Sequence, residues 1–193
     1  MTYQRPAYEE VTIAHGGNAV TLRPSLRAAA ILESRYGFPA LYRALDELNI
    51  TIISEIILSA SVIRQDAAAF LFLVRGRPLF PFFLAIRQPL AELLEMFRPA
   101  PDSKAKPGTG KLIPWRDFYQ GLYAQATGFL GWTPETAWNA TPTEIDRAYA
   151  AHMDKLKAIH GSADNDQPSD DPREEVSEQE VRAGLAALKR HCR

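Results

Sequence analysis

The alternation of apolar and polar residues near the start of the chain predicts a β-hairpin. Val11-Thr12-Ile13 and Ala19–Leu22 alternate with a period of two, and they flank a turn at His15–Asn18 whose glycines tolerate positive φ. Pro24 is expected in the first turn of the next helix, where its missing N–H costs nothing. Gly37 is expected to end that helix, because glycine readily adopts the conformation of a helix C-cap.

Apolar residues spaced three and four apart predict further helices in the first half of the chain. These helices are expected after Pro39, over Thr51–Arg64, over Asp66–Val74 and over Pro89–Phe97. The β-branched residues of the second would also suit a strand, but its length and its central Glu55 favour a helix. The first half is therefore predicted to be mostly helical behind a small hairpin.

Three helices are predicted after residue 113. Trp115, Phe118 and Leu122 form a helical stripe, and Thr133-Pro134-Glu135 begins a second, short helix. Thr141–Glu144 has the pattern of a capping box, in which the Thr hydroxyl and the Glu carboxylate each bind a free backbone N–H. The last helix is expected to bury an apolar face formed by Ile145, Ala148, Tyr149, His152, Leu156 and Ile159.

Two stretches without large apolar residues predict boundaries in the chain. Pro99–Gly110 contains three prolines and two glycines, so residues 99–113 are expected to be a linker. A phosphate-binding loop is not indicated there, because Leu112 stands where that motif needs Ser or Thr. Gly161–Glu180 holds eight acids against one base and almost nothing to bury, which is typical of a disordered acidic segment.

The predicted fold class is mainly α, with an N-terminal β-hairpin. Its expected parts are a hairpin-plus-helical module at 1–98, the linker at 99–113, a three-helix module at 114–160 and an acidic tail with a short basic helix at 161–193.

Composition limits the function classes. The chain has 193 residues, 46% of them hydrophobic, and a net charge of -1, which argues against a protein that mainly coats nucleic acid. Neither Ile50–Ile63 nor Leu79–Ile86 reaches the roughly 18 uninterrupted apolar residues of a membrane span. One cysteine, Cys192, allows no intramolecular disulfide. A soluble protein of a reducing compartment is expected, with no membrane partner.

No catalytic residue, cofactor or metal site is predicted. His152 and His160 are eight residues apart on one helix, too far along its axis to share a metal ion. No serine lies in a Gly-x-Ser-x-Gly elbow, and Cys192 is in a terminal tail, which is not expected to supply the rigid electropositive pocket that activates a thiol. The sequence therefore favours a binding protein over an enzyme.

Two motifs resemble those of phage tail assembly chaperones, of the type found in long-tailed phages and gene transfer agents. Trp138 is followed by Thr141-Pro142-Thr143-Glu144-Ile145, which is similar to the C-terminal signature of that family. Thr21–Leu26 then leads into an Ala/Leu-rich helix with a central Glu33, as in the family's N-terminal module. The resemblance implies a non-catalytic protein of the host cytoplasm, absent from the mature virion. The resemblance also implies that the protein binds the tape-measure protein and helps to recruit tail-tube subunits. Whether it forms a homo-oligomer stays open.

A chaperone for amphipathic helices needs partly exposed apolar surface. The candidate partner-binding residues are aromatic: Phe80, Phe82, Phe83, Trp132 and Trp138. Taken singly, each of them favours the core over an interface; the tryptophans do so because the small C-terminal module has little else to bury. The alternative function is a helical DNA-associated regulator of a phage or its host, favoured only by Arg182, Lys189, Arg190 and Arg193.

Overall fold

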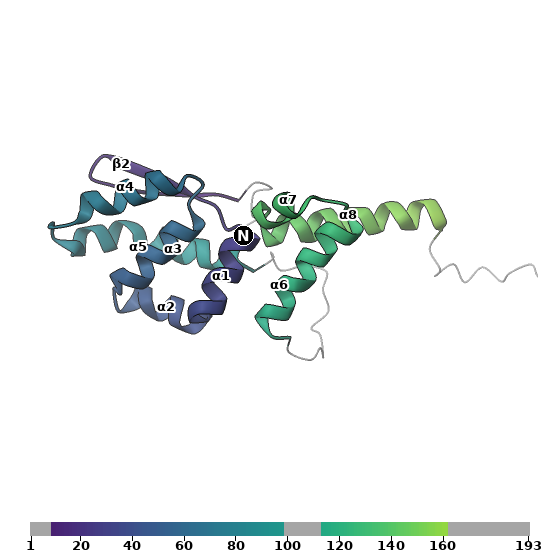
Figure 1. Ribbon diagram of the computed structural model, residues 1–193, viewed down its shortest axis with the longest axis horizontal. Helices are drawn as coiled ribbons and strands as arrows, with labels where there is room; N and C mark the ends of the chain where they lie inside the picture. The colour runs from purple at the N-terminus through teal and green to yellow at the C-terminus, as the bar shows by residue number, and fades with distance from the viewer. Residues whose placement is uncertain (1–8, 99–112, 162–193) are drawn as a thin grey trace, which may run out of the picture. The chain divides into compact units, whose positions relative to one another are not determined.

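The computed structural model describes residues 9–98 and 113–161 of the chain. Within these ranges an antiparallel hairpin is followed by helices, which confirms the predicted mainly helical fold with an N-terminal hairpin (Figure 1). The elements are β1 (Val11–His15), β2 (Asn18–Leu22), α1 (Leu26–Tyr36), α2 (Phe38–Asp46), α3 (Ile50–Ala60), α4 (Arg64–Val74), α5 (Leu79–Met96), α6 (Trp115–Ala124), the π-helical turn η1 (Gln125–Phe129), α7 (Pro134–Asn139) and α8 (Pro142–His160). Almost all of the predicted linker and acidic tail lies outside the described residues.

The hairpin turns over only two residues. Gly16 and Gly17 both have positive φ, at 58° and 82°, which suits a tight turn between twisted strands. The strands therefore run on to His15 and Asn18, which were expected in the turn and are instead paired with each other. Alternate side chains of both strands are buried, so one face of the hairpin covers the helices beneath it.

Helix α1 begins two residues later than Pro24 led us to expect. Ser25 is its N-cap, and the Ser25 hydroxyl accepts a hydrogen bond from the backbone N–H of Ala28 at 3.2 Å. Pro24 is buried just before the helix. Gly37 ends α1 with φ at 71°, as its position predicted.

Helix α5 is ten residues longer at its start than the prediction from Pro89. The proline lies inside the helix, where it removes one backbone hydrogen bond. A buried stripe nevertheless runs through it without a break, with members three or four residues apart: Phe82, Ile86, Leu90, Leu93 and Phe97. Each large apolar side chain contributes about 1.5–3 kcal/mol on burial, which outweighs the missing bond.

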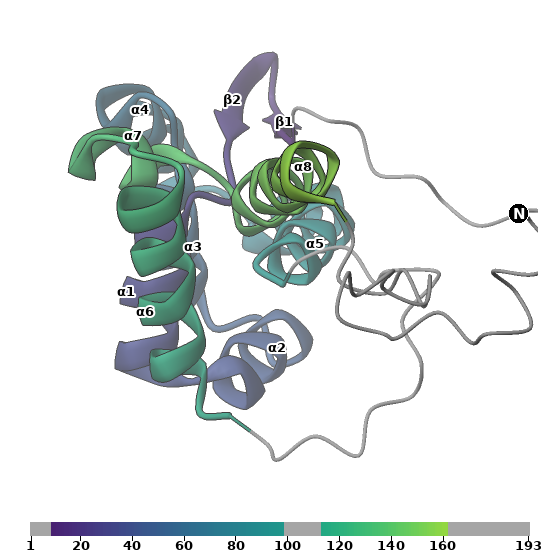
Figure 2. The same ribbon diagram turned by 90° about the vertical axis from the view of Figure 1, so that its right-hand side faces the viewer.

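Helices from both predicted modules share one core. Helices α6 and α7 pack against α1, and Figure 2 shows α1 and α6 side by side. The backbone N–H of Leu26, at the start of α1, donates to the carbonyl of Ala140 at 2.8 Å. Residues up to Lys155 accordingly form one compact unit, and Leu156 begins a second.

Helix α8 has the predicted start but not the predicted buried face. Its capping box is formed: the N–H of Glu144 donates to the Thr141 hydroxyl at 3.2 Å, and the N–H of Thr141 donates to the Glu144 carboxylate at 2.9 Å. Beyond Ile145 no described residue of the helix is buried, and Ile159 is 62% exposed. Full burial is therefore confined to the first turn of α8, while Ala148, Tyr149, His152 and Leu156 of the predicted face are half-buried.

Candidate partner-binding surfaces

The five aromatic candidates do not form one surface. Phe82 and Phe83 are only 0% and 5% exposed, so the structure corrects their assignment to an interface and puts them in the core. Their rings pack against each other, and Phe82 also contacts Phe70 and His15. Phe80 is 63% exposed and is the one member of this cluster that a partner could reach.

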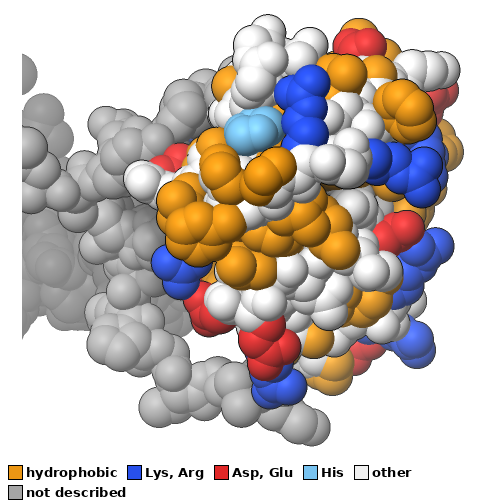
Figure 3. All heavy atoms as spheres, turned by 90° about the vertical axis from the view of Figure 1, so that its left-hand side faces the viewer, with side chains coloured by type: hydrophobic (Ala, Val, Ile, Leu, Met, Phe, Trp, Pro, Cys, Tyr) orange, Lys and Arg blue, Asp and Glu red, His pale blue; other side chains and the backbone are white. Residues whose placement is uncertain are grey.

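Large apolar side chains at the α4–α5 end of the protein are left in solvent. These residues, here called the tip face, are Phe72, Leu73, Leu79, Phe80 and Leu84. They flank the short turn between the two helices, and Figure 3 shows hydrophobic side chains gathered on this end of the protein with charged ones around them. A contiguous exposed apolar area of this kind marks an interaction site more often than chance.

Four members of the tip face were missed from the sequence, although a signal for them exists. Phe70–Val74 is five large apolar residues in a row, and a helix turning 100° per residue cannot bury them all on one side. The structure buries Phe70 and Val74 and leaves Phe72 and Leu73 outside. Which ones are exposed depends on how α4 is rotated against its neighbours, and the local pattern does not specify that.

A groove of about 610 Å³ runs beside the tip face between α3 and α4. One wall is a stripe of α3 with four-residue spacing, Ile50, Ser54 and Leu58. The other walls come from α4, the turn after it and the first residue of α5: Ala68, Leu71, Phe72, Val74, Arg75, Gly76, Arg77 and Leu79. Two helix stripes facing a shared trough form the kind of groove that accepts another helix.

The two candidate tryptophans are half-buried, and each lines a different hollow. Trp138 stacks on Tyr123, with ring centres 4.8 Å apart, and lines a hollow of about 510 Å³ beside Ile31. Trp132 lines a different hollow of about 750 Å³ beside Arg23 and Glu144. Both tryptophans are packed against the core and are only partly accessible to solvent.

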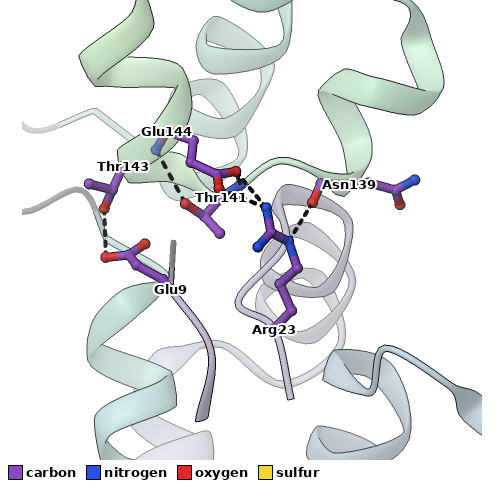
Figure 4. Close-up of polar contacts among 6 residues, drawn as sticks. All are labelled: Glu9, Arg23, Asn139, Thr141, Thr143 and Glu144. Atoms are coloured by element: carbon purple, nitrogen blue, oxygen red, sulfur yellow. Dashed lines mark hydrogen bonds and ion pairs between the residues drawn. The ribbon is translucent and has the colours of Figure 1, made fainter. Parts of the chain in front are cut away.

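The residues of both family-like motifs meet in one polar cluster (Figure 4). The Arg23 guanidinium binds both carboxylate oxygens of Glu144, at 2.8 and 2.7 Å, and donates to the carbonyl of Asn139 at 3.2 Å. Glu144 also forms the capping box with Thr141, so one carboxylate fixes both the start of α8 and the end of β2. Nearby, the Thr143 hydroxyl donates to the fully buried Glu9 at 3.1 Å.

Aromatic residues also form the contacts between α6 and the helices that precede it in the chain. Trp115 packs edge-on to Phe38, with ring centres 4.8 Å apart. The Tyr119 hydroxyl donates to the carbonyl of Phe97 at 3.1 Å, and burial raises the pKa of this hydroxyl well above its usual range. These contacts and those of the polar cluster join α6, α7 and the start of α8 to the elements before residue 99.

The described part of the chain was also compared with the requirements of a metal site and of a membrane-spanning helix. Residues 9–98 and 113–161 contain no group of three or more His, Cys, Asp or Glu side chains that could hold a metal ion. No helix in those ranges has both the length and the apolar character needed to cross a membrane. Comparisons with protein-family models, curated proteins and solved structures give no match to this chain.

Proposed function

We propose that this protein is a phage or prophage tail assembly chaperone that binds the tape-measure protein without catalysis. The observation that carries the proposal is the tip face with its groove. The tip face has five exposed large apolar residues, and the groove beside it has a volume of about 610 Å³. A holding chaperone must cover apolar helices, and exposed apolar surface on a rigid scaffold does this without chemistry. In this proposal it acts in the host cytoplasm, helps to recruit tail-tube subunits and leaves before the virion is complete.

The polar cluster supports the resemblance on which the proposal builds. The two motifs that resemble the family are more than a hundred residues apart in sequence, yet Arg23 of the first binds Glu144 of the second. Because Arg23 and Glu144 bind each other, the two motifs would be expected to occur together in one chain. It favours a single folded chaperone body over two unrelated modules.

Co-expression with the tape-measure protein encoded nearby in the same genome tests the proposal. We expect the wild-type chain to keep the tape measure soluble and to co-purify with it. The double variant Phe72→Asp/Phe80→Asp should abolish co-purification, because both side chains are more than 60% exposed and neither is needed for the core.

The matched control is Ile113→Asp/Ile159→Asp, which removes two equally exposed apolar residues that are not members of the tip face. It should retain co-purification, and circular dichroism should show both variants folded. An insoluble tape measure with no co-purification of the wild-type chain would overturn the proposed function. Salt-sensitive DNA binding by the purified chain would then favour the regulator instead.

A further inference from the structure

Two arginines stand at one end of the groove without any acidic side chain among the residues that line it. Arg75 and Arg77 belong to the turn between α4 and α5, and both are exposed. The ion pairs of the described residues involve other arginines, such as Arg35 with Glu55 and Arg87 with Asp46. The groove is thus apolar along its length and cationic at one end.

The walls set the size of the occupant. Ile50, Ser54 and Leu58 span eight residue steps of α3, which is about 12 Å at 1.5 Å per residue. A helix laid along this stripe would match it with apolar residues over about two to three turns. The turn that carries the arginines begins where α4 ends at Val74, so the cationic end directly follows the α4 wall.

We infer that the groove takes an amphipathic α-helix of a partner protein that carries acidic residues at one end of its apolar stripe. The apolar residues fill the trough, and the acidic end faces Arg75 and Arg77, which fixes the direction in which the helix lies. The C-terminal end of a helix, with its partial negative charge, adds to the same preference. This inference rests on the proposed function, since it specifies which helices the chaperone would hold.

Two synthetic peptides test the inference with the full-length protein. Both are Ala-rich helices with Leu at i, i+4 and i+8, and they differ only in a C-terminal pair of Glu or Lys residues. Fluorescence anisotropy should show the Glu peptide binding about three- to tenfold tighter at low salt, and the difference should shrink as salt is raised.

The double variant Arg75→Glu/Arg77→Glu should reverse the preference between the peptides. Its matched control, Arg43→Glu/Arg116→Glu, changes the net charge equally at exposed positions outside the groove and should leave the preference unchanged. Equal affinities for both peptides, or the same shift in both variants, would overturn the inference. So would a dimer of this chain that Leu58→Asp dissociates, because the groove would then hold a second copy.

The two proposals fail separately. The Arg75→Glu/Arg77→Glu variant keeps the apolar tip face. Whether this variant still co-purifies with the tape-measure protein therefore tests the proposed function alone. Retained co-purification with no charge preference among the peptides would remove only the further inference.

Discussion

At the scale of single residues, the Arg23–Glu144 pair should hold the polar cluster together. Their side chains are only 18% and 21% exposed, so the charges are partly shielded from water. We expect Arg23→Met and Glu144→Gln each to lower the free energy of unfolding by about 1–3 kcal/mol. A double-mutant cycle from urea denaturation should give a coupling energy of about 1 kcal/mol or more.

The Arg87–Asp46 pair is the natural control for that cycle. Its side chains are 59% and 67% exposed, at the same separation of 2.7 Å, so solvent screens them far more. The same cycle there should give a coupling below about 0.5 kcal/mol. Equal coupling energies at the two pairs would contradict a structural role for the cluster.

Tyr42 should make the protein sensitive to alkali. Burial, together with the hydrogen bond to Glu95 at 2.5 Å and the charge of Glu95, raises the pKa of Tyr42 to about 12. The unfolded chain then loses the proton first, at about pH 10, so the free energy of unfolding should fall as the pH rises from 10 to 12 and stay unaffected by this group below 10. Urea denaturation across this range should show a smaller fall for Tyr42→Phe; identical pH profiles would contradict the prediction.

At the scale of elements, α5 passes from an exposed side chain to a fully buried one within three residues. Phe82 is fully buried, and Phe82→Ala should cost about 3–5 kcal/mol of unfolding free energy. Phe80→Ala, two residues earlier, should change it by no more than about 0.5 kcal/mol, because its ring is 63% exposed. Chemical denaturation of the two variants measures both, and comparable losses would contradict the placement of the two rings.

Local signals made some elements predictable from the sequence and left others open. The hairpin, the end of α1 at Gly37 and the capping box at Thr141 each depend on a few adjacent residues, and the structure has all of them. The predicted start of α5 was wrong because Leu79–Leu84 is apolar at nearly every position and shows no helical periodicity. Burial along the whole stripe, which is a tertiary effect, decides where that helix begins.

At the scale of the whole molecule, the groove could not be predicted because it belongs to no single segment. Its walls are stripes of α3 and α4, and each stripe alone is an ordinary helix face. The aromatic content singled out Phe80, Phe82 and Phe83 together, but the composition of α5 could not separate the exposed ring of Phe80 from the buried rings of the other two. Surface and core were distinguishable only once the helices were packed.

The shared core predicts that the first 98 residues do not keep their structure alone. A chain ending at Arg98 loses three large side chains that the full protein buries, Tyr119, Leu122 and Ile145. At about 1.5–3 kcal/mol each, their loss approaches the total stability of a small protein, which is about 5–15 kcal/mol. The truncated chain should therefore show a much lower melting temperature by circular dichroism, weak near-ultraviolet signals and strong binding of a hydrophobic dye.

A chain ending at Gly161 is the control, since it keeps every buried residue of the described core. It should melt in one transition at the temperature of the full-length protein, because a single compact unit of this size is expected to unfold cooperatively. Cooperative melting of the chain ending at Arg98 at that same temperature would instead establish two independent modules. In that case the contacts of Arg23 with Glu144 and of Phe38 with Trp115 would add little to stability, and the N-terminal module with its tip face would be a domain that folds by itself.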